Sequence, residues 1–271
     1  MRLSGKVALV LGGAKGLGRE IVFFLARQGV TVATTYWDWP EESATLRSEL
    51  AALSSDHLTV AADLRDPLAV ATLFAKIQER YGRLDILINN IERGGMPVVH
   101  GEYTSDQWEL ELATTLKAKR WVFHHALPML KGSGDGAVVN ITSIAGLVGR
   151  SGPAGLIFND GYSAANRAVG LLTESWARAG APEVRVNELM LGFFATRHAQ
   201  GTRGWGLLTE EQRLAITDHI LLGRTGRSEE VLKAIHFLLG EADYLTGATL
   251  RLDGGYVLGG EKIPPMPPGV E

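Results

Sequence analysis

Three glycines, Gly12, Gly16 and Gly18, follow the apolar run 7–11 at the spacing G-x-x-x-G-x-G. Glycines at such a place let the chain turn sharply after a strand, bring bare backbone against a pyrophosphate and pack the next helix closely. A helix over 17–28 would point its N-terminal amides and the positive end of its dipole at that anion. The spacing predicts a nucleotide site, although a tight turn without a ligand is the alternative for a lone glycine motif.

Apolar runs alternate with longer helical patterns along almost the whole chain, which predicts βαβ units and a parallel sheet covered by helices on both faces. Strands are expected at 7–11, 31–35, 58–61, 86–91, 137–142, 184–190 and 249–252, and helices at 17–28, 41–53, 68–81, 105–127, 162–179 and 229–239. Thr104 and Gln107 are spaced for a capping box at the start of the helix over 105–127.

Two stretches, 144–161 and 197–217, interrupt this alternation with glycines, aromatics and polar residues, as expected of loops that form a site. The prolines of the tail 263–271 favour an extended segment. Because the 271 residues show no interdomain linker, we expect the whole chain to form a single domain.

The composition excludes several classes of function. Lys and Arg number 27 and Asp and Glu 30, which gives a net charge of -3 and no electrostatic footprint for nucleic acid or an anionic membrane. The chain has no cysteine, so disulfides, thiol catalysis and thiolate metal sites are excluded. No export signal and no apolar run of membrane length is found, and a cytoplasmic protein is therefore expected.

Six further segments follow the glycine turn in an order that resembles the short-chain dehydrogenase/reductase family over nearly the whole chain. They are ADL at 62–64, LDILINN at 84–90, VVNITSIAG at 138–146, YSAANRAVGLL at 162–172, VRVNELMLG at 184–192 and YLTGATLRLDGGY at 244–256. The resemblance implies an α/β fold, a Rossmann-like doubly wound parallel sheet of about seven strands in three layers, α/β/α. It also implies a nicotinamide cofactor at the carboxyl edge of the sheet and a homodimer or homotetramer.

Carbonyl reduction needs a hydride donor, a proton donor for the carbonyl oxygen and a second hydrogen bond that holds this oxygen. The resemblance assigns the proton transfer to Tyr162 and the positioning of the oxygen to Ser143, from their contexts YSAAN and ITSIAG. It thereby implies an NAD(P)(H)-dependent oxidoreductase that reduces a ketone or 3-oxoacyl-type carbonyl to an alcohol. The two residues are nineteen positions apart, more than is usual in the family, so an insertion is expected between them.

The resemblance also places the adenosine ribose of the cofactor at the end of the second strand, where Tyr36 and Trp37 stand instead of a carboxylate. Lys15 resembles the basic residue that pairs with the 2′-phosphate in members that prefer NADP. These two features favour NADP(H), while Asp38 leaves NAD(H) open as the alternative. A solvated surface side chain is the alternative for Lys15.

The remaining cofactor contacts follow from positions in the family's motifs. Asp63 and Leu64 match the pair that holds the adenine ring, and Thr196 fits the residue whose hydroxyl meets the carboxamide. Asn90 belongs to the motif beside the nicotinamide ribose, and Leu17 opens the helix at the phosphates. The alternatives are that Asp63 only ends a strand and that Thr196 caps a turn.

Departures from the family pattern concentrate where the chemistry would occur. The lysine expected four residues after the tyrosine is Asn166, which can bind ribose hydroxyls but carries no charge. The asparagine expected on the long crossover helix is Thr115, which weakens any proton relay through that helix. Leu11 replaces a threonine, and Ile91 with Glu92 replaces a pair of small residues beside the nicotinamide ribose. Loss of the cation makes the tyrosine less acidic, which biases the site toward reduction.

A catalytically impaired pseudoenzyme that supports a catalytic partner of the same fold, in a hetero-oligomer, is the alternative function.

Other basic residues near these positions are not expected to replace the lost cation. Arg167, Lys117 and Lys119 are expected to be surface charges. Candidate contacts to a small-molecule carbonyl or alcohol substrate lie in the segment 197–217, the expected substrate lid: Arg197, His198, Arg203 and Trp205.

Overall fold

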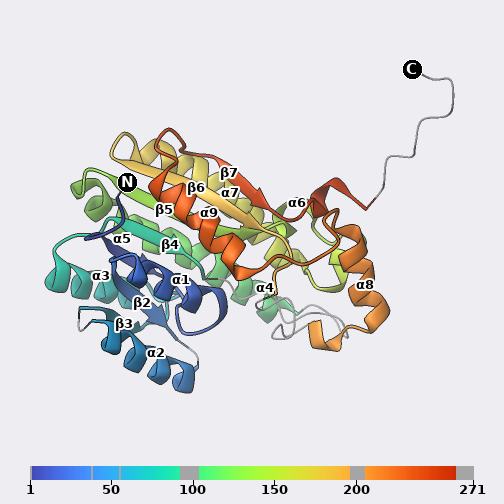
Figure 1. The fold of residues 1–271 in the computed structure, drawn as a ribbon, viewed down its shortest axis with the longest axis horizontal. Helices are drawn as coiled ribbons and strands as arrows, with labels where there is room; N and C mark the ends of the chain where they lie inside the picture. The colour runs from blue at the N-terminus through green and yellow to red at the C-terminus, as the bar shows by residue number, and fades with distance from the viewer. Residues whose placement is uncertain (1, 38, 55, 92–103, 196–204, 261–271) are drawn as a thin grey trace.

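Parallel strands form the middle layer of the structure, a computed structural model that describes residues 2–37, 39–54, 56–91, 104–195 and 205–260. They lie side by side in the order β3-β2-β1-β4-β5-β6-β7 (Figure 1). Their bounds are β1 Val7–Val10, β2 Thr31–Tyr36, β3 Leu58–Ala61, β4 Ile86–Asn89, β5 Gly136–Ser143, β6 Val184–Leu191 and β7 Thr249–Leu252. The order reverses between β1 and β4, so the predicted Rossmann-like doubly wound sheet is confirmed.

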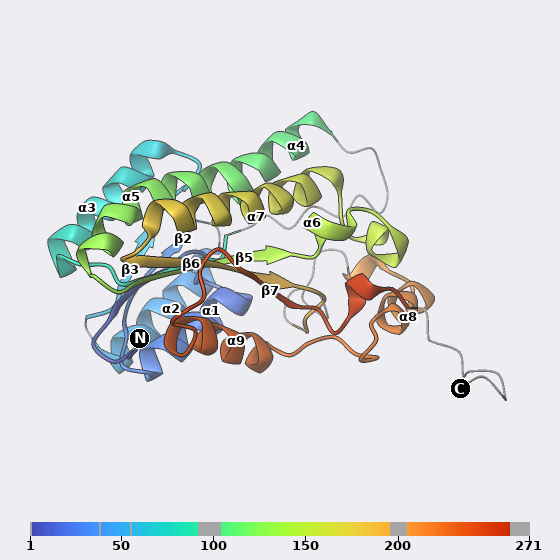
Figure 2. The same cartoon turned by 90° about the horizontal axis from the view of Figure 1, so that it is seen from above.

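Helices cover both faces of this sheet (Figure 2): α3, α4, α5 and α7 lie on one face, and α1, α2 and α9 lie on the other. The α-helices are α1 Gly16–Arg27, α2 Pro40–Leu53, α3 Pro67–Tyr81, α4 Ser105–Glu111, α5 Ala118–Gly132, α6 Ala145–Val148, α7 Asp160–Gly180, α8 Glu210–His219 and α9 Ser228–Gly240. Shorter elements are the π-helix η1 Leu112–Lys117 and the 3-10 helices η2 Gly152–Leu156, η3 Trp205–Leu207 and η4 Tyr256–Leu258.

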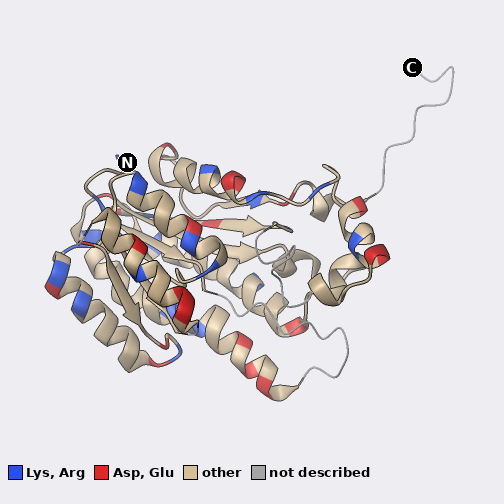
Figure 3. Cartoon of the chain, turned by 60° about the horizontal axis from the view of Figure 1, so that its bottom comes forward, with Lys and Arg blue, Asp and Glu red and all other residues tan. Residues whose placement is uncertain are grey.

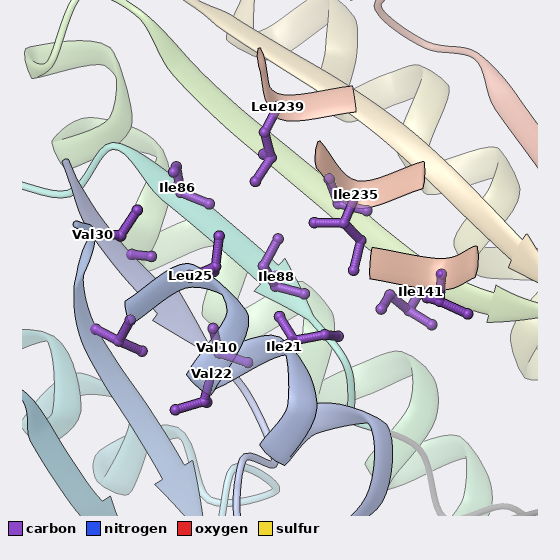
Figure 4. Close-up of a cluster of buried hydrophobic side chains, with 14 of the residues drawn as sticks. Val10, Ile21, Val22, Leu25, Val30, Ile86, Ile88, Ile141, Ile235 and Leu239 are labelled. Atoms are coloured by element: carbon purple, nitrogen blue, oxygen red, sulfur yellow. The ribbon is translucent and has the colours of Figure 1, made fainter. Parts of the chain in front are cut away.

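Alternate residues of the strands fill two cores, one on each face of the sheet. Val10 and Ile88 pack with Ile21 of α1 and Ile235 of α9 (Figure 4). Leu9 belongs to the second core, which α3, α5 and α7 cover. Since both faces are covered by helices, the strands appear in the sequence as continuous apolar runs.

The helix predicted over 105–127 differs from the observed one in its middle. There α4 passes into the six-residue π-helix η1 and then into α5, which continues to Gly132. The capping box at its start is confirmed, because Thr104 Oγ1 accepts a hydrogen bond from the Gln107 backbone N at 3.3 Å and Gln107 Oε1 accepts one from the Thr104 backbone N at 3.0 Å. An α-helical period in the sequence contains no signal for the wider turn of a π-helix.

Two regions that were expected to be loops contain helices. The stretch 144–161 includes α6 and η2, and the stretch 197–217 includes most of α8. Thr209 Oγ1 and Gln212 Oε1 form a capping box at the start of α8, with bonds of 3.2 Å and 2.9 Å. The loop expectation overlooked this T-x-x-Q spacing, which is a local signal for the start of a helix.

A buried carboxylate ties the first strand to the centre of the sheet. Asp85, whose side chain is fully buried, accepts hydrogen bonds from the Val7 backbone N at 2.9 Å and from the Arg83 guanidinium at 2.6 and 3.0 Å. Lys6 Nζ lies 3.3 Å from the same carboxylate. Burial alone would raise the pKa of Asp85, but the hydrogen bonds from Arg83 and Val7 outweigh burial and hold the pKa below its ordinary value.

We expect Asp85→Asn to lower the free energy of unfolding at pH 7 by about 3 kcal/mol, because it removes the anion from a buried hydrogen-bonded group. A pKa that is lower in the folded state stabilises the fold above the unfolded value, and this stabilisation is lost as the pH falls through the folded pKa. Urea unfolding at pH 7 and in acid should therefore show a difference between wild type and variant that shrinks in acid. Asp135→Asn is the control, since its half-exposed carboxylate lies 3.8 Å from the same Lys6. An equal loss in both variants would contradict the prediction.

Candidate active site

The turn between β1 and α1 is a tight backbone cradle. Gly12 and Gly16 have positive φ angles of 71° and 56°, a conformation that favours glycine. A Cβ on Gly18 would lie 2.1 Å from the carbonyl oxygen of Gly12, so α1 can approach the turn only with glycine at this position. Thr35 Oγ1 on β2 accepts a hydrogen bond from the Gly12 backbone N at 3.2 Å. Thr35, which the sequence analysis missed, therefore supplies from a neighbouring strand the hydroxyl that Leu11 lacks.

The helix α1 begins at this cradle without a side-chain cap. Its N-cap residue, Lys15, makes no capping hydrogen bond, and no acidic residue stands in the first turn. Leu17 packs partly buried against the core, which fixes this turn on the sheet. The first amides of a helix carry partial positive charge and bind phosphate oxygens well. The cradle and the helix start therefore fit the pyrophosphate of a dinucleotide.

Basic and aromatic side chains surround the end of β2, where the adenosine ribose is expected. Tyr36 Oη accepts a hydrogen bond from Arg47 of α2 at 3.2 Å. Lys15 Nζ lies 4.1 Å from the ring centroid of Trp39 and 3.6 Å from a carboxylate oxygen of Glu42. Arg47 was missed because it belongs to none of the family segments. Two cations thus stand at this end of the sheet, and both are exposed enough to exchange partners with a ligand.

The predicted adenine position is already organised by an ion pair. Asp63 accepts hydrogen bonds from the Arg65 side chain at 2.6 and 2.8 Å and from the Arg65 backbone N at 3.0 Å. The side-chain hydrogen bond from Arg65 lowers the pKa of Asp63. Leu64 is buried in the core, whereas Trp37 is 58% exposed. The adenine contacts of Asp63 and Leu64 and the ribose contact of Trp37 stay predictions.

Ser143 ends β5, Tyr162 lies in the first turn of α7, and Asn166 joins the two. Asn166 Oδ1 accepts a hydrogen bond from the Ser143 backbone N at 3.0 Å, and its Nδ2 donates to the Tyr162 carbonyl at 2.9 Å. Asn159 caps α7, because its Oδ1 accepts from the Tyr162 backbone N at 2.8 Å. The Asn166 side chain is 0% exposed. In this structure Asn166 fixes the strand to the helix, and its contact with a ribose stays a prediction.

The insertion between these two candidate catalytic residues is folded. A Cβ on Gly146 would lie 2.8 Å from the Arg167 backbone N, so the absence of a side chain lets α6 pack directly on α7. The Ala154 backbone N in η2 donates a hydrogen bond to Tyr256 Oη at 2.7 Å. Burial raises the pKa of Tyr256 to about 12, although the hydrogen bond from Ala154 opposes this rise. The residues between Ser143 and Tyr162 therefore pack as a layer at the end of the sheet.

Aromatic rings pack beside Tyr162. The ring of Phe158 lies 5.8 Å from that of Tyr162 and 5.4 Å from that of Phe193, centroid to centroid. Phe193 in turn lies 5.1 Å from Tyr256 and 6.5 Å from Trp205. Trp205, a predicted substrate contact, thus belongs to this aromatic cluster. Phe158 and Phe193 were missed because apolar side chains give no chemical signal in a sequence.

The prediction that Lys119 is a surface charge is wrong. Its side chain is 0% exposed, and its Nζ donates a hydrogen bond to the Ile141 carbonyl at 2.7 Å. Arg167 and Lys117 are exposed, as predicted. The π-helix η1 precedes Lys119. It makes a different face of α5 meet the sheet than in an uninterrupted α-helix of the same sequence, and an α-helical period cannot anticipate this difference.

Glu111, Thr115 and Lys119 form a line of buried polar side chains on the crossover helix. Glu111 is 3% exposed, and its Oε1 accepts a hydrogen bond from Asn159 Nδ2 at 2.7 Å. The Thr115 hydroxyl is buried and has no hydrogen-bond partner among the described residues. Thr115 lies within η1, where the wider turn of the π-helix changes the angle between residues four apart from that of an α-helix.

The motif after β4 narrows the space at the glycine turn. Asn90 Nδ2 donates a hydrogen bond to the Leu11 carbonyl at 3.4 Å. Ile91 Cγ2 comes within 3.4 Å of the place that a Cβ on Gly12 would occupy. Six predicted residues lie outside the described part of the chain: Asp38, Glu92, Thr196, Arg197, His198 and Arg203.

Lys and Arg are interspersed with Asp and Glu over the helices (Figure 3), in keeping with the net charge of -3. Within the described ranges, no group of His, Asp or Glu side chains is arranged to hold a metal ion. None of the helices described there combines the length and the hydropathy needed to cross a membrane.

Comparison with known proteins identifies relatives over almost the full length. A family model described as short chain dehydrogenase matches residues 6–206. A 3-oxoacyl-[acyl-carrier-protein] reductase of Thermotoga maritima is 30% identical over 263 residues, covering 95% of this chain and all of the relative. Nodulation protein G of Azospirillum brasilense is 32% identical, covering 93% of this chain and 98% of the relative. The solved structure of a candidate short-chain alcohol dehydrogenase from Sinorhizobium meliloti is similar with a TM-score of 0.81, at 27% identity, covering 94% of this chain and 98% of that one.

Proposed function

Because this chain belongs to the short-chain dehydrogenase family and is therefore an oxidoreductase, we propose that it uses NAD(P)H to reduce a ketone or 3-oxoacyl-type carbonyl to an alcohol. The observation that carries the proposal is the linkage of Ser143 and Tyr162 through Asn166 at the carboxyl end of β5. Ligands of doubly wound sheets bind at the carboxyl ends of the strands, near the point where the strand order reverses. The relatives named as 3-oxoacyl reductases support the substrate class.

In this proposal Tyr162 donates its phenolic proton to the carbonyl oxygen, and Ser143 donates a second hydrogen bond as negative charge develops there. A bound nicotinamide supplies the hydride. Ser143 Oγ accepts a hydrogen bond from the Ala145 backbone N at 3.1 Å, which orients the hydroxyl and leaves its hydrogen to donate. The neutral phenol needed for reduction is the abundant form of a tyrosine at neutral pH, so reduction is the favoured direction.

The aromatic cluster beside Tyr162 favours a substrate with an apolar group next to its carbonyl. Phe158 and Phe193 pack there, almost fully buried, and bring no formal charge next to Tyr162. A 3-oxoacyl chain fits this pattern because one side of its carbonyl is hydrocarbon. Arg197 and Arg203 stay candidates for contacts with an anionic group elsewhere on the substrate.

NADP(H) is the proposed cofactor, with NAD(H) as the alternative, and the support comes from Lys15 and Arg47. The pair of Lys15 with Glu42 is largely exposed, and such pairs contribute about 0–1 kcal/mol. A 2′-phosphate carries more charge than Glu42 and can replace it as the partner of Lys15. Tyr36 Oη, which accepts from Arg47, offers a further hydrogen-bonding group at the same place.

We expect Lys15→Ala to raise the Kd for NADPH about three- to tenfold and to leave the Kd for NADH nearly unchanged, because only NADPH has the phosphate that the ammonium contacts. Titration of tryptophan fluorescence measures both constants. Lys131→Ala, which removes an exposed lysine paired with Glu183 far along the chain, is the matched control. An equal rise in the Kd for NADPH and the Kd for NADH would argue against a contact between Lys15 and the 2′-phosphate.

A turnover panel tests the proposed function. The purified chain is incubated with NADPH or NADH and with 3-oxoacyl thioesters, aliphatic ketones or aromatic ketones, and the loss of reduced cofactor is followed by absorbance. We expect consumption of NADPH with at least one class of carbonyl. Cofactor binding without turnover, together with turnover gained in Asn166→Lys, would favour the pseudoenzyme alternative, which the comparisons do not support.

We further propose that residues 1–271 work as one domain, with 197–217 as the substrate lid and 263–271 as an extended tail. The described part of the lid consists of η3 and most of α8. A homodimer or homotetramer in the cytoplasm is proposed, with a hetero-oligomer as the alternative. Light scattering on the purified chain and on a lysate-captured complex distinguishes these assemblies.

A further inference from the structure

A buried lysine lies on the crossover helix, next to the strand that ends in Ser143. Lys119 is among the largest side chains that are fully buried, and its Nζ lies 2.7 Å from the Ile141 carbonyl oxygen. Lysine is almost never fully buried unless it is paired, because removal of an ammonium from water is costly. A hydrophobic residue could fill the same space without that cost. The position therefore keeps an ionisable side chain at the expense of stability.

The edge of β5 that Lys119 meets is the edge that faces the candidate site. The pairing of β4 with β5 ends at Asn140, so the last residues of β5 have no strand beside them on that edge. The Ile144 backbone N donates to the Leu191 carbonyl on β6. Backbone groups alternate between the two edges of a strand. The backbone groups of Ile141 and Ser143 therefore face the edge of β5 away from β6, past the end of β4.

Two side chains satisfy these neighbouring backbone groups. Lys119 donates to the Ile141 carbonyl, and Asn166 accepts from the Ser143 backbone N. Residues two apart on a strand are separated by about 7 Å. The ammonium of Lys119 thus lies on the same strand edge as the Asn166 amide, one step from it, and the same amide binds the Tyr162 carbonyl.

Other ionisable groups lie on the elements that pack around α7 and β5. Glu111 of α4 accepts from Asn159, the residue that caps α7. Glu188 of β6, under α7, accepts from Thr142 Oγ1 at 2.6 Å and from Thr249. Tyr256 of η4 is buried with a raised pKa and is neutral. Among the described residues of this set, Lys119 is the basic side chain, and Glu111 and Glu188 are the acidic ones.

We propose that Lys119 supplies, from the crossover helix, the positive charge beside Ser143 and Tyr162 that Asn166 cannot supply. It is a positioning residue that acts through the end of β5 and the Asn166 amide. The inference rests on the proposed reductase, in which Tyr162 loses its proton to the substrate. A cation in the interior stabilises the tyrosinate that remains, because charges interact strongly away from water.

The test compares Lys119→Gln, which keeps a donor for the Ile141 carbonyl but removes the charge, with Lys117→Gln as the exposed control on the same helix. Tyr162 is titrated by ultraviolet difference absorbance, with Tyr162→Phe subtracted in each background. We expect Tyr162 to titrate about one to two pH units higher in Lys119→Gln and at the wild-type value in Lys117→Gln. The kcat for carbonyl reduction should fall about tenfold or more in Lys119→Gln alone.

Restoring a cation on α7 provides the reciprocal test. Asn166→Lys added to Lys119→Gln should return the Tyr162 titration and most of the lost kcat, because the two positions share one strand edge. A Tyr162 titration that does not move in Lys119→Gln would overturn the proposal. A wild-type pKa of Tyr162 above the ordinary value of about 10 would also overturn it, and this measurement does not depend on the folding of any variant. The titration uses no substrate, so a chain without turnover would refute the proposed function and leave this inference to be decided by absorbance.

Discussion

Tyr162→Phe is expected to lower kcat for carbonyl reduction by a factor of about 10²–10⁴, the usual contribution of a positioned proton donor. The phenyl ring keeps the packing against Phe158, and the hydrogen bonds with Asn159 and Asn166 involve only backbone atoms of Tyr162. The melting temperature and the Kd for NADPH should therefore stay close to the wild-type values. Steady-state kinetics with the best substrate of the turnover panel, together with thermal melting, measures both quantities.

Tyr244→Phe is the matched control for this substitution, because the Tyr244 side chain is fully exposed. It removes a phenolic hydroxyl from the same chain at a place that touches neither the cluster nor the glycine turn. We expect no change in kcat. Turnover that survives in Tyr162→Phe would mean that another group donates the proton, and the assignment of Tyr162 would have to be given up.

Gly18→Ala is expected to weaken binding of NADPH and NADH alike, by roughly ten- to a hundredfold. The added Cβ would lie 2.1 Å from the Gly12 carbonyl oxygen and 2.6 Å from Asn90 Nδ2, so α1 must move away from the turn. Overpacking of this kind costs about 1–3 kcal/mol, and each 1.4 kcal/mol corresponds to about tenfold in affinity. Fluorescence titration with both cofactors measures the effect, and thermal melting shows how much of the cost falls on folding.

Gly132→Ala provides the comparison for Gly18→Ala. Gly132 ends α5, and a Cβ there would meet nothing within 4 Å. The substitution should leave both dissociation constants unchanged. Cofactor binding that tolerates Gly18→Ala would show that the cradle does not hold the pyrophosphate, and the Rossmann-like fold would then serve without a dinucleotide at this turn.

The sheet could be predicted from the sequence because helices cover both of its faces. The central strands are buried on both sides and are therefore apolar along most of their length. All seven strands, including the partly exposed edge strands β3 and β7, were placed to within about two residues at each end. The glycine turn was also predictable, since Gly12, Gly16 and Gly18 are required by backbone geometry alone. Where a residue's role depends only on its own segment, that role can be predicted from the sequence.

The missed residues depend on contacts between distant segments. Thr35 supports the glycine turn from the next strand, and Arg47 reaches Tyr36 from the following helix. Phe158 and Phe193 come together only when the insertion packs against the segment after β6. Lys119 was misplaced because its burial depends on the helical phase set by the residues before it. These relations arise from tertiary structure, and no local pattern reports them.

The π-helix η1 indicates how the crossover helix can gain a residue during evolution. A π-helix accommodates one residue more than the α-helical turn it replaces, which is the structural result of a one-residue insertion. Because the π-helix takes up the extra residue, the residues before and after it keep the faces that they would have without the insertion. Deleting one residue from η1 should accordingly return this segment to an α-helix and leave Lys119 against β5. A residue can therefore be gained in the crossover helix without turning the side chains of α5 away from the strands on which they pack.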